Sequence, residues 1–440
     1  MHLLIEKHLT LPAIPHEWTL QVDYHQASGI LALLTLQNEQ GTVLSISQTE
    51  QFIKAEILFD AKQTPIILLA ELPETEAVSL LISNSRSRIA LYVNQQLCDE
   101  DWTLGSVPLE NCICTESDAQ IVLGDDFSAE NCDLLNSSFS PVTHIQNWSP
   151  DGLNTGVGDV MPFSHDGTFH LFYLFDRRGH GSKWGLGAHQ WAHLSTTDLL
   201  TWQQHPMAIG IDEQYEGSIC TGSLIFHNGL YYAYYAVRMS DGSPAKLSWA
   251  VSSDGIHFQK TQAFFTLSAP YEPVSARDPF VFRDDEGLFH LLITTSLIDP
   301  HSTPKGCLAH LTSVDLQSWQ QQTPFLVVAH TDQPECSDYF HLNGWYTLIF
   351  SNYGRAHYRI SRTPFGPWLK PENDILGFKE CRVPKTAIFK GNRIIIAGFV
   401  VFPNAGYAGE LIVYEALQNA EGTLSFFTPK ELDTPRTVLT

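Results

Sequence analysis

Hydrophobic and polar residues alternate along much of the first 100 residues. From Trp18 to Tyr24 every second residue is apolar or aromatic, and the residues between them are polar. A period of two is that of a strand with one buried face, whereas an amphipathic helix repeats every 3.6 residues. Similar runs follow at residues 30–36, 42–47, 52–59 and 78–82, and residues 89–97 have the pattern of a hairpin. These short strands, with turns between them, predict a β-sandwich over residues 1–138.

The hairpin at Leu91–Leu97 resembles the strand-turn-strand of concanavalin- or laminin-G-like jelly rolls. That resemblance implies a carbohydrate-binding module, and the alternative is a domain that only packs against and supports its neighbour. Residues 126–150 are rich in Asn, Ser and Pro, which is typical of a link. We therefore expect a second domain over residues 139–440.

A different pattern occurs five times after Asp159. Each copy has a short apolar strand, a tight turn with a glycine, and a second apolar strand rich in aromatic residues. The turn glycines are Gly167, Gly229, Gly287, Gly344 and Gly391, 47 to 62 residues apart. Most copies continue with a Ser or Thr, an acid-containing turn and an aromatic residue, as in residues 195–202, 252–258 and 312–319. An all-β repeat of this length predicts a five-bladed propeller with four strands in each blade, and a sandwich with chance similarity is the alternative.

Three of the five copies carry an acidic residue at the start of the first strand: Asp159, Asp278 and Glu335. If the copies superpose, their first strands line the central channel and the acids meet at one of its mouths. A buried carboxylate is costly unless it is paired or functional, so three at equivalent positions indicate a site.

Clustered carboxylates suit glycoside hydrolysis. One ionised group attacks or stabilises the cationic sugar centre, and a second, protonated group donates to the leaving oxygen. Repulsion within the cluster would raise the pKa of one carboxyl, as the acid role requires. Calcium binding is a rival use of three carboxylates, but the chain has no Asp-x-Asp loop to support it. We expect no metal and no cofactor.

Composition narrows the class of ligand. The chain of 440 residues is 43% hydrophobic and 11% aromatic, as in globular proteins, and 48 acidic against 25 basic residues give a net charge of −23. Such a charge argues against nucleic acid and anionic membranes as partners. No signal peptide or transmembrane run is recognisable, so we expect a cytoplasmic protein. The eight cysteines lack paired spacing, which argues against a zinc site or a disulfide framework.

Several motifs of the second domain resemble those of one enzyme family. Arg277-Asp278-Pro279 matches an Arg-Asp-Pro motif, Glu335-Cys336 a Glu-Cys motif, Trp191-Ala192-His193 a Trp-Gly-His motif, Thr221-Gly222-Ser223 a Ser-Gly-Ser segment, and Lys385 a late Lys-Ser/Thr element. In their order and spacing, residues 140–430 resemble glycoside hydrolase family 32, the invertases and fructan hydrolases, within the wider group of five-bladed furanosidases.

The resemblance implies roles for individual residues. Asp159 would be the nucleophile, Asp278 the transition-state stabiliser and Glu335 the acid/base of a retaining double displacement. The residues expected to contact substrate are Arg277, Trp184, His193, Thr221, Ser223, Arg382 and Lys385. For His193 the alternative is packing within a blade, and for Arg382 and Lys385 it is neutralisation of the acids.

The chain departs from the family pattern near the expected nucleophile. Asp159 lies between Gly158 and Val160, where the family has Trp-x-Asn-Asp-Pro-Asn-Gly. Leu174 replaces a Gln, and Cys220 replaces an aromatic residue. These positions shape the pocket for the terminal sugar, so we predict a hydrolase for a terminal furanosyl-type sugar that acts on an oligosaccharide or small glycoside. The alternatives are an inverting arabinanase- or xylosidase-like propeller and a catalytically silent sugar-binding protein.

Overall fold

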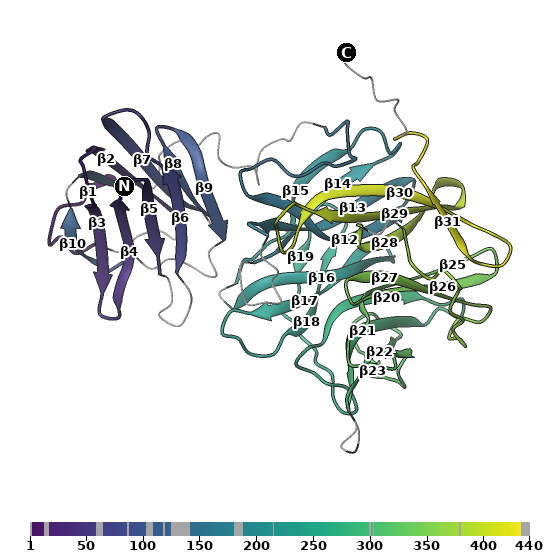
Figure 1. Ribbon diagram of the computed structural model, residues 1–440. Coiled ribbons are helices and arrows are strands. Elements are labelled where there is room, and N and C mark those ends of the chain that lie inside the picture. Colours follow the sequence, from purple (N-terminus) through teal and green to yellow (C-terminus); the bar gives the residue numbers. More distant parts are fainter. Residues whose placement is uncertain are drawn as a thin grey trace, which may run out of the picture.

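The computed structural model describes residues 2–12, 17–58, 65–85, 88–102, 109–117, 119–124, 141–179, 188–213, 215–298, 301, 303–377 and 380–432. The described chain is almost entirely β-structure: an N-terminal β-sandwich followed by a five-bladed β-propeller (Figure 1). The predicted fold class is confirmed. The predicted boundary at residue 138 lies outside the described residues.

The sandwich consists of two antiparallel sheets. One has the order β1-β11-β2-β7-β8-β9 and the other the order β10-β3-β4-β5-β6. The strands are β1 (His2–Leu4), β2 (Trp18–His25), β3 (Leu31–Asn38), β4 (Gly41–Gln48), β5 (Phe52–Ile57), β6 (Ile66–Glu71), β7 (Ala77–Ser85), β8 (Arg88–Val93), β9 (Gln96–Trp102), β10 (Ile113–Ser117) and β11 (Gln120–Gly124). Of these, β1, β6, β10 and β11 were not among the predicted strands. They are short strands of three to six residues.

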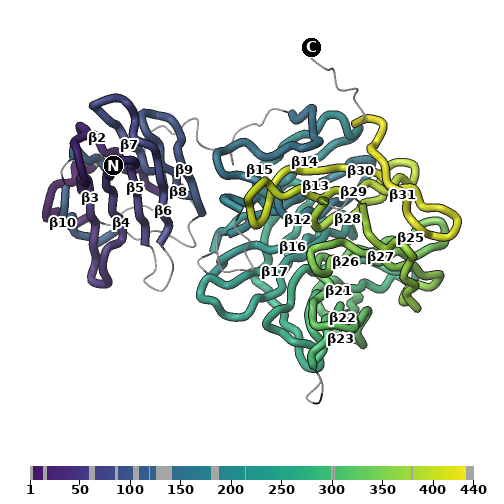
Figure 2. Tube along the Cα trace, viewed as in Figure 1, coloured from purple at the N-terminus to yellow at the C-terminus, as the bar shows by residue number. Residues whose placement is uncertain are grey.

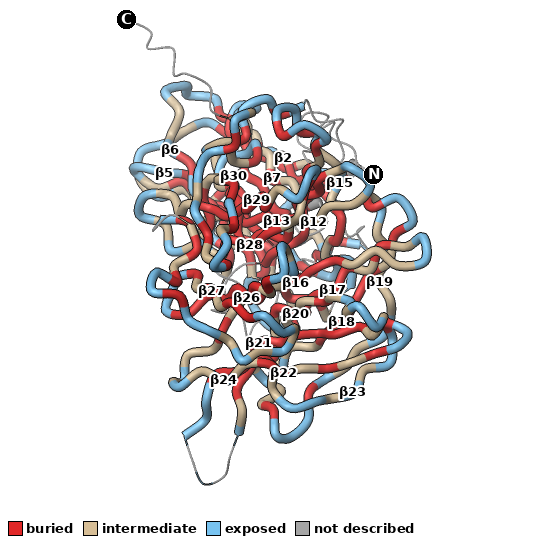
Figure 3. The backbone as a smooth tube through the Cα atoms, turned by 90° about the vertical axis from the view of Figure 1, so that its right-hand side faces the viewer, coloured by how far each residue is buried: buried red, intermediate tan, exposed pale blue. Residues whose placement is uncertain are grey.

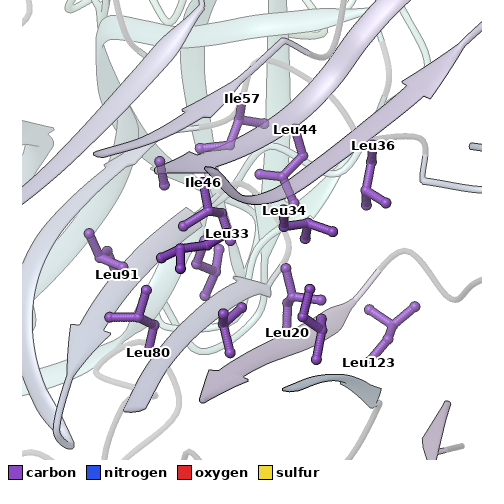
Figure 4. Close-up of a cluster of buried hydrophobic side chains, with 14 of the residues drawn as sticks. Leu20, Leu33, Leu34, Leu36, Leu44, Ile46, Ile57, Leu80, Leu91 and Leu123 are labelled. Atoms are coloured by element: carbon purple, nitrogen blue, oxygen red, sulfur yellow. The ribbon is translucent and has the colours of Figure 1, made fainter. Parts of the chain in front are cut away.

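The core of the sandwich lies between its two sheets. The side chains predicted to share one face of β2, from Trp18 to Tyr24, are all buried in this core. Leu34 and Leu44 of one sheet face Leu80 and Leu91 of the other (Figure 4). The alternating pattern therefore identified the buried face correctly.

Each propeller blade is an antiparallel sheet whose first strand is innermost. Blade one holds β12 (Thr155–His165), β13 (Thr168–Arg177), β14 (Gln190–Thr196) and β15 (Gln203–Ile209); blade two β16 (Glu216–His227), β17 (Leu230–Met239), β18 (Lys246–Ser252) and β19 (Gln259–Lys260); blade three β20 (Arg277–Arg283), β21 (Phe289–Leu297), β22 (Lys305–Ser313), β23 (Gln320–Gln321) and β24 (Leu326–Val327); blade four β25 (Glu335–Leu342), β26 (Trp345–Asn352) and β27 (Arg355–Ser361); blade five β28 (Arg382–Phe389), β29 (Arg393–Val401), β30 (Gly409–Gln418) and β31 (Leu424–Phe427). Four strands were predicted in every blade, but the described sheet of blade four has three. A bridge between Val157 and Gly409 joins blades one and five and closes the ring. Buried residues concentrate along the central strands (Figure 3).

Both repeated sequence markers have a structural explanation. All five turn glycines adopt a positive φ, between 70° and 92°, which favours glycine because it has no Cβ. The second marker is a capped turn after the third strand. Asp198, Asp254 and Asp315 each accept hydrogen bonds from two backbone N–H groups and from the preceding Ser or Thr hydroxyl. These acids are architectural, unlike the three at the starts of the inner strands.

The sandwich contacts the propeller through a buried ion-pair cluster. The edge strand β9 lies beside blade one (Figure 2). Glu100 of β9 binds Arg177 of β13 at 2.5 Å and Arg88 of β8 at 2.7 Å, and the Glu100 and Arg177 side chains are at most 1% exposed. The Arg177 guanidinium also lies 4.4 Å over the ring of Trp102, which packs edge-on against Phe175. The first domain is thus joined to the blade that supplies Asp159.

Blades one and three contain equivalent pairs of histidines, of which His170, His193 and His290 are buried. His170 contacts His193 at 3.0 Å between ring nitrogens, and His290 contacts His310 at 2.8 Å. Burial, followed by neighbouring histidines, lowers the pKa of His170 and of His310 to about 4. Both therefore remain neutral in the folded protein where the unfolded chain, with a histidine pKa near 6.5, would already bind protons.

These pairs predict a loss of stability in acid. Because the folded pKa is the lower one, stability falls as the pH drops from about 6.5 to about 4, by roughly 3 kcal/mol for each histidine. In urea unfolding measured across this range, the stability of the wild-type protein relative to His170→Gln should decrease toward acid. A difference that does not change between pH 7 and pH 4 would contradict the prediction.

Candidate active site

The inner strand of every blade is interrupted by a bulge at the same end of the channel. The pairing with the second strand breaks between Val157 and Val160, Ile219 and Gly222, Arg277 and Phe280, Glu335 and Asp338, and Arg382 and Lys385. A bulge bends a strand and changes the direction of its side chains, and bulges are common beside active sites. Five bulges in register therefore form a ring of redirected residues at one mouth.

The three acids occupy neighbouring positions of this ring. Asp278 is the first residue inside its bulge and has a φ of 53°, Asp159 is the second inside its own, and Glu335 comes directly before its bulge. The expectation that they are strictly equivalent is therefore wrong. The place of the acid relative to the bulge differs by one residue between these blades, and the distance to the turn glycine does not reveal this difference.

All three acids line one cavity of about 560 Å³. The other residues lining it are Leu174, His189, Cys220, Thr221, Arg277, Cys336, Gly354, Arg382, Val383, Phe399, Val401, Phe402, Ala405, Gly406 and Tyr407. Acids and arginines come from blades one, three, four and five, and an apolar wall comes largely from the end of β29 and residues 402–406. A concave pocket with a few convergent polar groups is the usual form of a small-molecule site.

Arg277 connects two of the acids. Its Nη2 donates to Glu335 Oε1 at 2.7 Å, and its Nε lies 3.7 Å from Asp278 Oδ2. Its Nη1 donates to the carbonyl of Ser275 and to the side chain of Gln333, which hold the guanidinium in place. Arg277 thus orients the pair of carboxylates, as the family resemblance implies for Asp278.

Asp278 is the most buried of the three acids. It is 4% exposed, and its Oδ2 accepts a hydrogen bond from the backbone N–H of Cys336 at 3.1 Å. Burial raises the pKa of Asp278 above its usual value, Arg277 opposes this rise, and the charges of Glu335 and Asp159 add to it. The predicted repulsion contributes to this rise and burial is its larger cause, but the raised pKa belongs to Asp278, the expected stabiliser, whereas the prediction linked it to the acid role.

Asp159 accepts hydrogen bonds on both carboxylate oxygens. Tyr407 donates to Oδ1 at 2.8 Å, whereas Thr221 donates to Oδ2 at 2.6 Å and the Cys336 thiol lies 3.3 Å from Oδ2. The Tyr407 oxygen is also 2.9 Å from the backbone nitrogen of Asp159. These contacts hold the carboxylate in one orientation in the cavity.

The predicted substrate-contacting residues fall into three groups. Thr221, Arg277 and Arg382 line the cavity with the acids. Trp184 lies outside the described residues. The structure does not bring His193, Ser223 and Lys385 to the cavity.

The residues away from the cavity have packing roles. The ring of His193 stacks on Phe172 at 4.1 Å inside blade one, and the equivalent His310 in blade three shows that this position is part of the blade. Ser223 donates to the carbonyl of Pro279 in the next blade. Lys385, 2% exposed, donates to the carbonyl of Gly222. Ser223 and Lys385 therefore join neighbouring blades, whereas His193 packs within one blade.

Sequence reasoning missed Tyr407 and Cys336, which both contact Asp159. Cys336 belongs to the Glu-Cys motif, so its position beside Glu335 was a usable signal. Tyr407 comes from the connection between β29 and β30 and belongs to no repeated pattern. Gly158 is the residue whose type reflects the presence of Tyr407, because a Cβ at position 158 would lie 2.6 Å from the Tyr407 hydroxyl oxygen.

Among the described residues, no three His, Cys, Asp or Glu side chains are placed to hold a metal ion. In the same part of the chain, no helix has the length and apolar character needed to cross a bilayer.

Comparison with known proteins identifies the family that this propeller resembles. Residues 160–364 match the model described as "Glycosyl hydrolases family 32 N-terminal domain". This chain is family 32-like. The matched segment includes Asp278 and Glu335. It begins one residue after Asp159, where the sequence departs from the family motif. The resemblance predicted from the sequence is confirmed.

Individual proteins agree with the family match. Sucrose-6-phosphate hydrolase of Bacillus subtilis (strain 168) is 27% identical over 223 residues, which is 48% of this chain and 44% of that protein. The chain thus spans less than half the length of this curated relative. The sucrose-6-phosphate hydrolase structure from Lactobacillus gasseri superposes with a TM-score of 0.54 at 19% identity, covering 69% of this chain and 67% of that one. Fructan 1-exohydrolase IIa from Cichorium intybus gives 0.53 at 17% identity, covering 65% and 60%. The two structural likenesses establish the fold.

Proposed function

We propose that the protein is a glycosidase that cleaves a terminal furanosyl-type sugar from an oligosaccharide or small glycoside. The observation that carries this proposal is the meeting of Asp159, Asp278 and Glu335 in one cavity, with Arg277 contacting two of them. Family 32 relatives named as sucrose-6-phosphate hydrolases support the same class of reaction.

For its mechanism we propose the retaining double displacement that the family resemblance implies. Asp159 attacks the anomeric carbon while Glu335, 28% exposed and therefore accessible from the cavity, gives its proton to the leaving oxygen. Glu335 then takes a proton from the water that releases the sugar. Asp278, held by Arg277 and the Cys336 N–H, contacts the sugar hydroxyls and stabilises the charge on the ring in both steps.

Two cavity residues favour a substrate that differs from the usual one of the family. Leu174 and Cys220, which replace a Gln and an aromatic residue of the family pattern, both line the cavity. Loss of an amide removes hydrogen bonds to sugar hydroxyls. We therefore expect the enzyme to accept fructosides and also furanosides whose sugar has fewer hydroxyls facing Leu174 and Cys220.

A screen for hydrolysis tests the proposal. The panel comprises sucrose, sucrose 6-phosphate, 1-kestose, 4-nitrophenyl β-D-fructofuranoside, 4-nitrophenyl α-L-arabinofuranoside and 4-nitrophenyl β-D-xylopyranoside. We expect turnover of at least one furanoside, with retained configuration of the first product observed by NMR. Inverted product would favour the arabinanase- or xylosidase-like alternative, with Asp159 as general base. Binding by calorimetry without any hydrolysis would favour a sugar-binding protein.

A further inference from the structure

We infer that Tyr407 is the partner of the nucleophile: it selects Oδ1 of Asp159 as the attacking oxygen and stabilises that oxygen when the sugar leaves it. This inference rests on the proposed retaining mechanism and adds a residue to it.

The position of the Tyr407 proton follows from its two contacts. A backbone N–H can only donate, so the N–H of Asp159 donates to the Tyr407 oxygen at 2.9 Å. The hydroxyl proton is then free to point only at its other partner, Asp159 Oδ1, 2.8 Å away. Burial, with the nearby Asp159 charge, raises the pKa of Tyr407 well above its ordinary value, so the hydroxyl retains this proton.

The two carboxylate oxygens of Asp159 differ in how many lone pairs remain free of hydrogen bonds. A carboxylate has about two lone-pair sites on each oxygen. Oδ2 receives the Thr221 hydroxyl and the Cys336 thiol, so both of its sites are used. Oδ1 receives Tyr407 alone among the described residues, and one lone pair of Oδ1 stays available for the anomeric carbon.

The surroundings of Tyr407 are built to hold its hydroxyl there. The ring stacks on His189 with centroids 5.2 Å apart, and His189 is fixed by a 2.6 Å contact to Asp176. On another side the ring meets Phe399 at 5.4 Å. Gly158 leaves the space that the hydroxyl occupies, because a Cβ at this position would lie 2.6 Å from the Tyr407 oxygen. The glycine at position 158, which departs from the family motif, therefore makes room for the Tyr407 hydroxyl.

The consequence differs between the two chemical steps. In the first step a bond forms between Oδ1 and the anomeric carbon, the bond to the leaving oxygen breaks with its electron pair, and that oxygen takes the proton of Glu335. In the second step water attacks, its proton passes to Glu335, and the bonding pair returns to Oδ1. Negative charge reappears on Oδ1 beside the Tyr407 hydroxyl, so Tyr407 assists departure from the covalent intermediate more than its formation.

The test uses Tyr407→Phe with 4-nitrophenyl β-D-fructofuranoside and 4-nitrophenyl α-L-arabinofuranoside. A good leaving group makes the second step limit kcat. We expect kcat to fall roughly 10- to 100-fold, as for a lost hydrogen bond to a charged group, with a parallel fall in KM and a change in kcat/KM below about threefold. Rapid mixing should then show a burst of about one nitrophenol per active site.

Two further variants make the outcome decisive. Gly158→Ala displaces the hydroxyl without removing it and should show the same fall in kcat and KM. Tyr271→Phe is the matched control, because this buried tyrosine in blade three donates to the carbonyl of Gln322 away from the cavity, and it should change neither constant. Equal falls in kcat and kcat/KM without a burst, or no change in either, would overturn the inference. If the wild-type protein cleaves neither probe nor any other furanoside, the proposed function fails; if it cleaves one, Asp159→Asn is inactive and Tyr407→Phe behaves as wild type, only the role of Tyr407 fails.

Discussion

Replacing Asp159 with Asn should reduce the rate of furanoside hydrolysis by about a thousandfold or more. The amide has almost the shape of the carboxylate and can still meet Thr221 and Tyr407, but it carries no charge with which to attack the anomeric carbon. Glu335→Gln should cause a loss of the same order for substrates with poor leaving groups, because the amide has no proton to give to the leaving oxygen. Initial rates with the substrate identified in the screen measure both effects.

The control for these variants is an acid that the fold uses differently. Asp315 caps the turn after β22 and lies outside the cavity, so Asp315→Asn should leave the rate within about twofold of wild type. Circular dichroism and the thermal midpoint of Asp159→Asn should match those of the wild-type protein. Turnover at the wild-type rate by a folded Asp159→Asn variant would remove Asp159 from the mechanism.

The sequence was sufficient to predict the propeller because its blades repeat. The turn glycines need a positive φ, and the turn acids Asp198, Asp254 and Asp315 must cap the same backbone turn, so both markers persist in blades whose other residues differ. The sandwich has no such repeat, and four of its short strands were missed. Blade four has no described fourth strand, and the expectation of four strands in every blade was wrong there.

The candidate site was predictable only as far as strand positions could be counted. Counting placed Asp159, Asp278 and Glu335 near one mouth of the channel. It could not show that they stand at three successive positions relative to the bulges of their strands. The family resemblance also placed Ser223 and Lys385 at the site. In the structure both lie on inner strands, a few residues along the strand from the cavity, and bond to backbone carbonyls of neighbouring strands.

Contacts between segments distant in the chain were beyond the reach of the sequence. Tyr407 reaches Asp159 across 248 residues. The space at Gly158 and the hydroxyl that fills it become connected only when blade five lies beside blade one. The same holds for the contact between the two domains, because no sequence pattern connects Glu100 with Arg177.

That contact carries the second large expected effect, which is on stability. Glu100→Gln keeps the shape of the side chain but removes the charge that Arg88 and Arg177 share, and it leaves two guanidinium groups close together in a buried place. Removing one partner from a buried ion pair costs about 3–5 kcal/mol, because the remaining buried charge loses its main compensating partner. Urea unfolding followed by tryptophan fluorescence should show this decrease, since Trp102 lies in the contact with Arg177 above its ring.

The matched variant is Glu56→Gln in the same sandwich. Glu56 pairs with Lys54 on β5, but both side chains are more than a third exposed to solvent. Water screens such a pair, so its loss should cost at most about 1 kcal/mol. If the two substitutions cost the same, the contact between Glu100 and Arg177 does not fasten the sandwich to the propeller. If Glu100→Gln is the more costly by several kcal/mol, the first domain is a fixed support of the blade that holds Asp159, and the supporting role weighed against carbohydrate binding gains a physical basis.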